Sequence, residues 1–185
     1  MSGITYERID AAGGVQWPCP ADDPEVPLGG TARLYADGRF PNPSGRVQLH
    51  RAVRQELRDK PRREFPLLLN TGRTVEHWHT RTKTARVPLL DRLAPEAWVE
   101  MNEVDGDALG VRTGDVVRVT SSRGEIPRII VRITPIVRAG EVFIPFHYDE
   151  ACANRLTVDE FDPISREPNF KQCAVRIERA EAHPR

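Results

Sequence analysis

Short apolar and alternating runs dominate the second half of the chain and predict a mainly β fold. Strands are expected at residues 65–69, 97–101, 115–120, 126–133, 141–146 and 173–177. Alternation over a run of about five residues is typical of a half-buried strand, whereas a continuous short apolar run favours a buried one. Six short strands with one or two small helices predict a β-barrel or a compact α+β fold.

Capping and turn residues mark the ends of several of these elements. Asn102 is expected to cap a helix over residues 103–109, and Gly110 suits the left-handed position that ends it. Residues 121–124 are typical of a hairpin turn. Pro127 favours an edge position for the strand it begins, because proline cannot donate to a β-ladder. A further helical turn is expected at residues 155–161.

Residues 1–62 are predicted to form an extended, loop-rich connector that precedes a globular domain at 63–185. Proline and glycine interrupt this arm so often that little periodic apolar pattern survives. Such a segment is more typical of an arm that lies across another domain or subunit. Residues 51–60 are expected to form one short helical stretch. The expected anchors of the arm are its apolar and aromatic residues, Tyr6, Val15, Trp17, Leu34, Tyr35 and Phe40.

Composition narrows the functional classes. Lys+Arg and Asp+Glu are equal at 27 each, so no basic balance favours a nucleic-acid partner. The three cysteines form no CxxC pair, which excludes a zinc ribbon or an iron–sulfur cluster built from this sequence alone. An odd number of widely spaced cysteines, no visible secretory signal and no apolar stretch of about 20 residues favour a cytoplasmic protein without a membrane segment.

The segment Thr71–Thr80, directly after the first strand, carries the clearest candidate chemistry. A glycine at a strand end lets the backbone approach a ligand, and Arg73 beside it can bind phosphate oxygens in a forked geometry. Taken alone, Thr71, Gly72 and Arg73 favour the alternative, a plain turn with an exposed arginine. If the segment is extended, His77 and His79 share one face and Trp78 takes the other. Hydrogen bonding to a heterocyclic ligand is favoured over metal binding, because no third metal ligand is evident. A buried Trp78 between solvated histidines is the alternative.

Two further groups of residues have open interpretations. Thr80, Thr82 and Thr84 alternate with cations, which fits either a ligand-facing strand or a solvated edge strand. Phe146, His147 and Tyr148 end a predicted strand, where aromatic side chains either line a pocket or cap the core. No nucleophile elbow, P-loop or GxGxxG motif is present. The residues alone therefore indicate a small β-rich domain with a polar ligand site after its first strand.

The motifs of this chain resemble those of molybdopterin oxidoreductases. TGRTVEHWHT at 71–80 is similar to a segment in the C-terminal domain of the bis-molybdopterin guanine dinucleotide enzymes of the dimethyl sulfoxide reductase superfamily, especially nitrate reductases and formate dehydrogenases. Further matching segments follow in the family's order at 13–19, 37–45, 100–110, 114–124, 142–147, 153–157, 162–165 and 170–175. The resemblance covers nearly the whole chain.

The resemblance implies a double-psi β-barrel for residues about 64–180, preceded by the arm. It also implies that the chain contacts bis-molybdopterin guanine dinucleotide through Thr71, Gly72, Arg73, Glu76, His77, Trp78, His79, Thr80, Thr82, Asn154 and Lys171. Phe146 and His147 match positions near the substrate funnel. No residue of this chain is expected to be catalytic or to ligate the metal. The protein ligand to molybdenum and the iron–sulfur cluster are expected in an upstream part.

The implied function is cofactor binding in a molybdenum oxidoreductase, most closely a nitrate reductase of nitrate assimilation. The expected partners are upstream catalytic domains or a catalytic subunit and a small substrate, nitrate or formate. The alternatives are a formate dehydrogenase domain, a separately encoded non-catalytic subunit, and an interaction module without cofactor. The isolated chain is not expected to turn over.

One segment departs from the family's pattern. Many relatives have Gly-Thr-Met-Thr or Gly-Ser-Met-Thr after the HWHT sequence, whereas this chain has Arg81-Thr82-Lys83-Thr84. The added positive charge is expected either to contact phosphate or to alter entry to the site.

Overall fold

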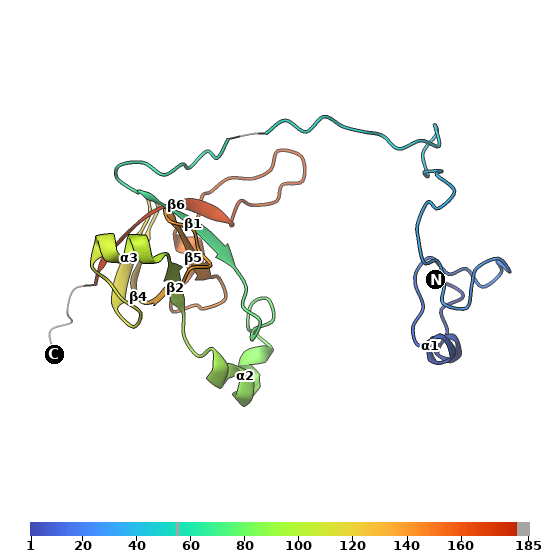
Figure 1. The fold of residues 1–185 in the computed structure, drawn as a ribbon, viewed down its shortest axis with the longest axis horizontal. Helices are drawn as coiled ribbons and strands as arrows, with labels where there is room; N and C mark the ends of the chain where they lie inside the picture. Colours follow the sequence, from blue (N-terminus) through green and yellow to red (C-terminus); the bar gives the residue numbers. More distant parts are fainter. Residues whose placement is uncertain (55, 181–185) are drawn as a thin grey trace. The chain divides into compact units, whose positions relative to one another are not determined.

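A computed structural model of the chain describes residues 1–54 and 56–180, and divides it into two compact units, Met1–Gln55 and Glu56–Arg185. Figure 1 shows helix α1 in the first unit and the β-strands in the second. The domain boundary predicted between residues 62 and 63 stays a prediction.

The first unit is organised around helix α1 (Tyr6–Ala12), which the sequence reading missed. The Thr5 hydroxyl accepts a hydrogen bond from the Arg8 N–H at its start, and Gly13 ends it in a left-handed conformation with φ 67°. The Arg8 guanidinium donates to the carbonyls of Leu28 at 2.9 Å and Pro27 at 2.7 Å. One arginine thereby holds a loop that has little apolar core of its own.

Other expectations for the arm have mixed outcomes. The helix expected at residues 51–60 is wrong, since 51–54 and 56–60 contain no helical residue. Four of the six expected anchors are exposed: Tyr6, Trp17, Leu34 and Tyr35. Their role as anchors stays a prediction.

The second unit is a closed six-stranded barrel, as predicted. Its strands are β1 (Leu67–Gly72), β2 (Trp98–Met101), β3 (Val116–Thr120), β4 (Glu125–Ile133), β5 (Glu141–Pro145) and β6 (Gln172–Arg179). They close in the order β1-β5-β2-β4-β3-β6. The pairs β1·β5 and β2·β4 are parallel and the other four are antiparallel, so the strands interleave as in the predicted double-psi β-barrel.

Alternation along the strands fills the barrel. Leu69, Val99, Val117, Val131 and Ile144 are fully buried, and most of their strand neighbours are more exposed. Trp98 and Pro145 are exceptions, since both are buried beside an inward residue. Because closure removes the sheet edges, the edge position expected for Pro127 is wrong. The register of β3 and β4 instead shifts between Val117 and Val119, and this irregularity accommodates the proline.

The predicted caps are confirmed around helix α3 (Glu103–Leu109). Asn102 accepts from the Val104 N–H, and Gly110 has φ 66°. The predicted turn at 121–124 is closed by a hydrogen bond from Ser121 N to Gly124 O at 2.9 Å. The helical turn expected at 155–161 lies slightly earlier, as the 3-10 helix η2 (Ala153–Arg155).

Between β1 and β2 the chain leaves the barrel and returns. This excursion, residues 73–97, contains the 3-10 helix η1 (Thr84–Arg86) and helix α2 (Pro88–Leu93), which stands off the barrel in Figure 1. The strand considered for residues 80–84 is wrong. His79 and Arg81 have positive φ values of 51° and 64°, which no extended strand can contain.

Candidate functional site

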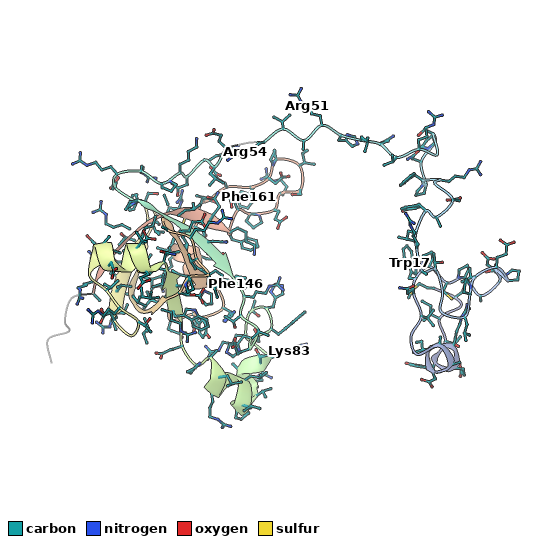
Figure 2. The ribbon with its side chains drawn as sticks, viewed as in Figure 1. Trp17, Arg51, Arg54, Lys83, Phe146 and Phe161 are labelled. Atoms are coloured by element: carbon teal, nitrogen blue, oxygen red, sulfur yellow. The ribbon has the colours of Figure 1, made fainter. Side chains whose placement is uncertain are left out.

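Three segments distant in sequence meet where β1 ends. The Thr71 N–H donates to the carbonyl of Lys171 at 2.9 Å, and the Thr71 hydroxyl donates to the carbonyl of Phe170 at 2.6 Å. On the other side, the Phe146 N–H donates to the carbonyl of Gly72 at 3.1 Å. Figure 2 labels Phe146 beside the tip of this strand. The backbone of β1 therefore fixes Phe146 and Lys171 relative to the segment 71–80.

Aromatic and cationic side chains gather at this point in a group that we call the Phe146 cluster: His79, Phe146, Phe170 and Lys171. The ring centroids of His79 and Phe146 are 6.3 Å apart, and those of Phe146 and Phe170 are 6.5 Å apart. Lys171 Nζ lies 5.8 Å from the centroid of Phe146 and 5.1 Å from that of Phe170. The cluster offers aromatic faces, a ring nitrogen and a positive charge to a ligand.

The two histidines of the segment have different environments, so the expectation of one shared face is wrong. His77 is 2% exposed, whereas His79 lies at the surface. Both ring nitrogens of His77 are occupied, Nδ1 by the Thr84 hydroxyl at 3.0 Å and Nε2 by the Ala94 carbonyl at 2.8 Å. His77 thus fastens the excursion to its own far end. Trp78, 65% exposed, is not the buried side chain of the alternative interpretation.

Behind the Phe146 cluster lies a buried pair, His147 and Tyr148, with ring centroids 4.6 Å apart. The Tyr148 hydroxyl donates to the Ala94 carbonyl at 2.8 Å, and burial raises the pKa of Tyr148 to about 12. Burial, with the nearby His77 and Arg81, lowers the pKa of His147 to about 4. Both side chains are therefore neutral near pH 7.

This neutral histidine predicts a pH dependence of stability. Because the folded-state pKa of His147 is about 4 against an ordinary 6.5, the unfolded chain binds the proton more tightly between those values. The free energy of unfolding should therefore fall as the pH is lowered from 6.5 to 4. Urea denaturation at pH 7, 5.5 and 4.5 measures this loss. In His147→Phe the loss should be smaller, and an equal loss in both proteins would contradict the assignment.

Arg81 has turned inward and does not extend its charge into the site. Its guanidinium donates to Asp91 Oδ1 at 2.7 Å and to the Pro95 carbonyl at 3.0 Å, and it lies 4.6 Å from the Tyr148 ring centroid. Thr80 and Thr82 share a hydrogen bond of 2.8 Å at the surface. Arg81, one of the two cations in residues 81–84, therefore stabilises the excursion through contacts within it and with Tyr148.

The remaining predicted site residues differ in exposure and in their distance along the fold from the segment 71–80. Arg73 is exposed and has no ion-pair partner in residues 1–54 and 56–180, and Glu76 is half-buried. The Phe143 side chain occupies the space beside Gly72, since a Cβ on Gly72 would lie 2.6 Å from Phe143 Cε2. Asn154 lies exposed on η2, and none of its side-chain contacts in the described chain reaches the segment 71–80.

Unpaired polar atoms test whether a polar cofactor fits this end of the barrel. Native proteins pair nearly all buried polar groups. In the described part of the chain, the buried side-chain atoms without a partner are Thr74 Oγ1, Arg81 Nε, Gln172 Oε1 and both ring nitrogens of His147. Thr74, His147 and Gln172 belong to or adjoin the segments that meet at the end of β1, whereas Arg81 is turned inward within the excursion. A ligand rich in hydrogen-bonding groups, such as a pterin dinucleotide, fits this donor and acceptor set.

Sequence reasoning did not single out Thr74, Phe170 or Gln172 individually. Thr74 lies inside the polar segment, and Phe170 and Gln172 flank Lys171, so proximity to singled-out residues was an available signal. Tyr148 was noted as an aromatic residue at a strand end, but nothing local indicated its partner, because Ala94 is 54 positions away in sequence.

Three curated relatives of the chain are nitrate reductase or formate dehydrogenase sequences, and the chain spans about a quarter of the length of each. It is 33% identical to the periplasmic nitrate reductase of Desulfovibrio desulfuricans over 192 residues, covering 96% of this chain and 25% of that protein. It is 38% identical to the F420-dependent formate dehydrogenase subunit alpha of Methanocaldococcus jannaschii over 177 residues, with the same two coverages. A nitrate reductase of Symbiobacterium thermophilum is also 38% identical, covering 95% of this chain and 25% of that protein.

The solved structure of acetylene hydratase from Pelobacter acetylenicus shares the fold, with a TM-score of 0.55 and 16% identity, covering 63% of this chain and 19% of that one. No helix in the described residues is long and apolar enough to cross a membrane. The model of the Molydopterin dinucleotide binding domain matches residues 67–174, which is more than half of the chain. This match confirms the predicted cofactor, bis-molybdopterin guanine dinucleotide with its molybdenum. The chain belongs to the Molydopterin dinucleotide binding domain family.

Proposed function

We propose that this chain is the cofactor-binding C-terminal part of a larger molybdenum oxidoreductase, of the nitrate reductase type. The observation that carries the proposal is the concentration of unpaired buried polar atoms where β1, Phe146 and Lys171 meet. The chain spans about a quarter of the length of the curated relatives it matches, so the remaining catalytic parts belong to partner domains or subunits.

In this proposal the side chains divide the binding task by charge and shape. Arg73 and Lys171 are exposed cations that attract the pyrophosphate oxygens. His79, Thr80 and Thr74 Oγ1 supply hydrogen bonds to heterocycle edges, and Phe146 limits access to the centre. The bound molybdenum would supply the two-electron chemistry, while the chain orients the cofactor and excludes water.

Cofactor content of an Arg73→Ala variant tests the proposal. The chain is co-expressed with the remainder of its protein, and guanine dinucleotide and molybdenum are measured per protein by mass spectrometry. Loss of the guanidinium should lower cofactor content several-fold, because charge-assisted hydrogen bonds to phosphate are each worth about 1.5–3 kcal/mol.

Arg63→Ala is the matched control, since Arg63 is an exposed arginine that precedes β1. It should leave cofactor content unchanged. Equal content in wild type and Arg73→Ala would remove Arg73 from the site. Absence of guanine dinucleotide from the wild-type complex would refute the proposed function and favour an interaction module without cofactor.

A formate dehydrogenase is the second candidate, favoured by the 38% identity to a formate dehydrogenase subunit alpha. Assays of the complete complex with nitrate and with formate separate the two, and the isolated chain should turn over neither. A separately encoded non-catalytic subunit is the third arrangement, and the position of the gene for the catalytic part decides it. A cytoplasmic location remains part of the proposal, although one relative is periplasmic.

A further inference from the structure

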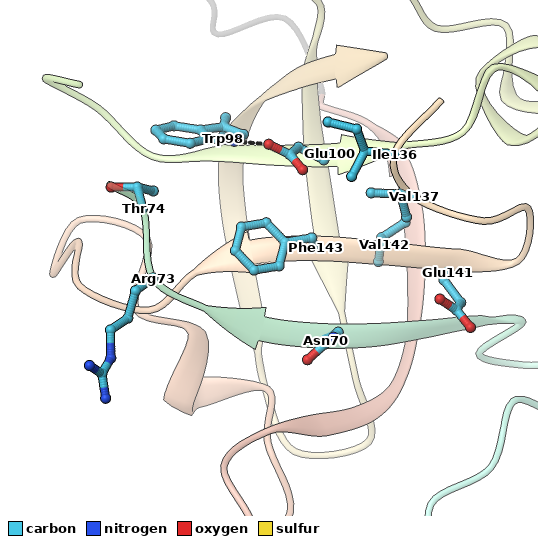
Figure 3. A pocket seen from close by; sticks show the side chains of 10 residues that line it. All are labelled: Asn70, Arg73, Thr74, Trp98, Glu100, Ile136, Val137, Glu141, Val142 and Phe143. Carbon is cyan, nitrogen blue, oxygen red and sulfur yellow. Dashed lines mark hydrogen bonds between the residues drawn. The ribbon is translucent and has the colours of Figure 1, made fainter. Parts of the chain in front are cut away.

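A cavity that we call the outer groove lies on the outside of the barrel across β1, β5 and β2. It encloses about 410 Å³. The strand registers place Asn70 beside Phe143 and Phe143 beside Glu100, so these three side chains form one outward row across the three strands. Figure 3 shows the Phe143 ring at the centre of this row.

The outer groove is distinct from the Phe146 cluster. In Figure 3 the Arg73 guanidinium points away from Glu100 and Phe143, although Arg73 borders the cavity. The Phe143 ring covers Gly72, where a Cβ would be only 2.6 Å from Phe143 Cε2. Phe143 therefore lies across the tip of β1, and the groove continues past it to Arg73 and Thr74, which the proposed function assigns to the cofactor site.

Negative charge in the outer groove is not balanced within the barrel. Glu100 accepts one hydrogen bond, from Trp98 Nε1 at 3.0 Å, which leaves its second carboxylate oxygen available. Glu141 lies two residues from Phe143 on the same face, and so is a diagonal neighbour of Glu100. Neither carboxylate forms an ion pair within residues 1–54 and 56–180.

The nearest cation in the register is already engaged. Arg132 is the β4 neighbour of Glu100, but its guanidinium carbon lies 3.6 Å from the Trp98 ring centroid. It stacks on the indole instead of pairing with the carboxylate. A second cation is therefore needed to neutralise the groove when it is covered, because burying an unpaired carboxylate is strongly unfavourable.

The groove also presents an apolar wall that reaches the surface. Val137 is buried beside it, and Ile136 next to Val137 is 84% exposed. Apolar surface next to carboxylates matches the long side chains of lysine and arginine, which lay their methylene groups on apolar atoms and extend their charge to an acceptor.

We propose that the outer groove is the docking site for a lysine or arginine side chain from the remainder of this protein. This inference rests on the proposed function, since it takes the chain to be a quarter of a larger assembly, as it is of its relatives' length. The cation pairs with Glu100 and Glu141 and covers Phe143. Docking there presses Phe143 onto Gly72 and so couples the interface to the tip of β1.

The double variant Glu100→Gln/Glu141→Gln tests the docking site. The 185-residue chain is titrated by calorimetry with the separately expressed remainder of the protein, at low and high sodium chloride. Wild type should bind more weakly at high salt. The double variant should bind at least about tenfold more weakly at low salt and lose most of that salt dependence. The glutamine amide oxygen keeps the acceptor for Trp98, so thermal unfolding of the variant chain should stay close to wild type.

Glu64→Gln/Glu167→Gln is the matched control, because both glutamates are exposed and lie outside the groove. It removes the same charge and should bind like wild type. Unchanged binding of the groove variant, an equal loss in the control, or no wild-type association would overturn the docking site. Guanine dinucleotide in the wild-type complex is measured in parallel. Its presence with unchanged groove-variant binding refutes the docking site alone, whereas its absence with weakened variant binding refutes only the cofactor function.

Discussion

Replacing Asp59 with asparagine should lower the free energy of unfolding of the barrel by about 2 kcal/mol, because it removes the charge of a buried carboxylate that is paired with two partly exposed arginines. Asp59 is 9% exposed. Its carboxylate accepts hydrogen bonds from Arg62 at 2.8 Å, from Arg123 at 3.4 Å and from the Ala174 N–H at 3.1 Å. These partners come from the segment before β1, the turn between β3 and β4, and β6.

The same network makes the effect depend on pH. Burial tends to raise the pKa of Asp59, but hydrogen bonds from Ala174, Arg62 and Arg123 outweigh it and hold the pKa below its ordinary 3.8. A depressed carboxylate pKa stabilises the fold above the unfolded value, and this contribution is lost as the pH falls through the folded value. The difference between wild type and Asp59→Asn should therefore be full at pH 7 and shrink below pH 3.8.

Chemical denaturation at pH 7 and at acid pH measures both effects. Asp107→Asn is the control, since Asp107 is an exposed carboxylate on α3 in the same unit. It should change the free energy of unfolding by less than about 0.5 kcal/mol. A loss of similar size in both variants would show that Asp59 does not link the three segments.

Local patterns were sufficient to predict the barrel. All six strands overlap the runs that predicted them, and helix α3 lies where its capping residues placed it. The first strand is shifted: it was expected at 65–69, but β1 runs over Leu67–Gly72 and includes Thr71 and Gly72. Each of these elements can be predicted from about ten residues, through alternation of apolar and polar residues or through capping residues such as Asn102 and Gly110. Helix α1 carries similar signals at Thr5 and Gly13, but the frequent prolines and glycines around it favoured an irregular reading.

The excursion after β1 could not be read in this way, because its conformation depends on distant partners. The buried His77 ring forms hydrogen bonds with Thr84 and with the Ala94 carbonyl, which lie 7 and 17 positions further along the chain. The alternation of threonines with cations at 80–84 suggested a strand, whereas the left-handed residues there form turns. Polarity identified the region of the site, but only tertiary contacts decide which side chains face a ligand.

Lys171 and Asn154 illustrate the same limit for the site. Both entered through resemblance and not through any local signal. The structure brings Lys171 to Phe146 because β6 begins beside the end of β1. Asn154 lies on η2, next to Arg155. The Arg155 carbonyl would be only 2.7 Å from a Cβ on Gly124, so η2 packs closely against the turn at 121–124. The cofactor contact of Asn154 stays a prediction.

Replacing Arg81 with alanine should destabilise the excursion by about 2–3 kcal/mol, because alanine loses contacts of Arg81 and keeps its unfavourable backbone. The lost contacts are the ion pair with Asp91, the hydrogen bond to the Pro95 carbonyl and the stacking on Tyr148. Cofactor content should fall with stability, since the excursion carries His79 and Thr74.

The variant Arg81→Gly separates the contribution of the backbone at position 81 to stability from the contribution of the side chain. Arg81 has φ 64°, a left-handed conformation that costs a residue with a Cβ about 1–2 kcal/mol but costs glycine little. Glycine should therefore be the less damaging replacement by about 1 kcal/mol, opposite to the usual preference for alanine over glycine. Arg86→Ala, at an exposed arginine of η1, is the control and should be near neutral. If Arg81→Ala were as stable as Arg81→Gly, the left-handed turn would be wrong.

The left-handed backbone at Arg81 also bears on how this chain departs from the sequence pattern that it resembles. Where many relatives have glycine after the HWHT sequence, this chain has an arginine in a backbone conformation that suits glycine. The strain is offset by the contacts with Asp91, Pro95 and Tyr148, so the arginine acts as a brace for the excursion and not as a phosphate ligand. Arg81→Gly should then restore the usual backbone but leave the brace absent, with cofactor content between those of wild type and Arg81→Ala.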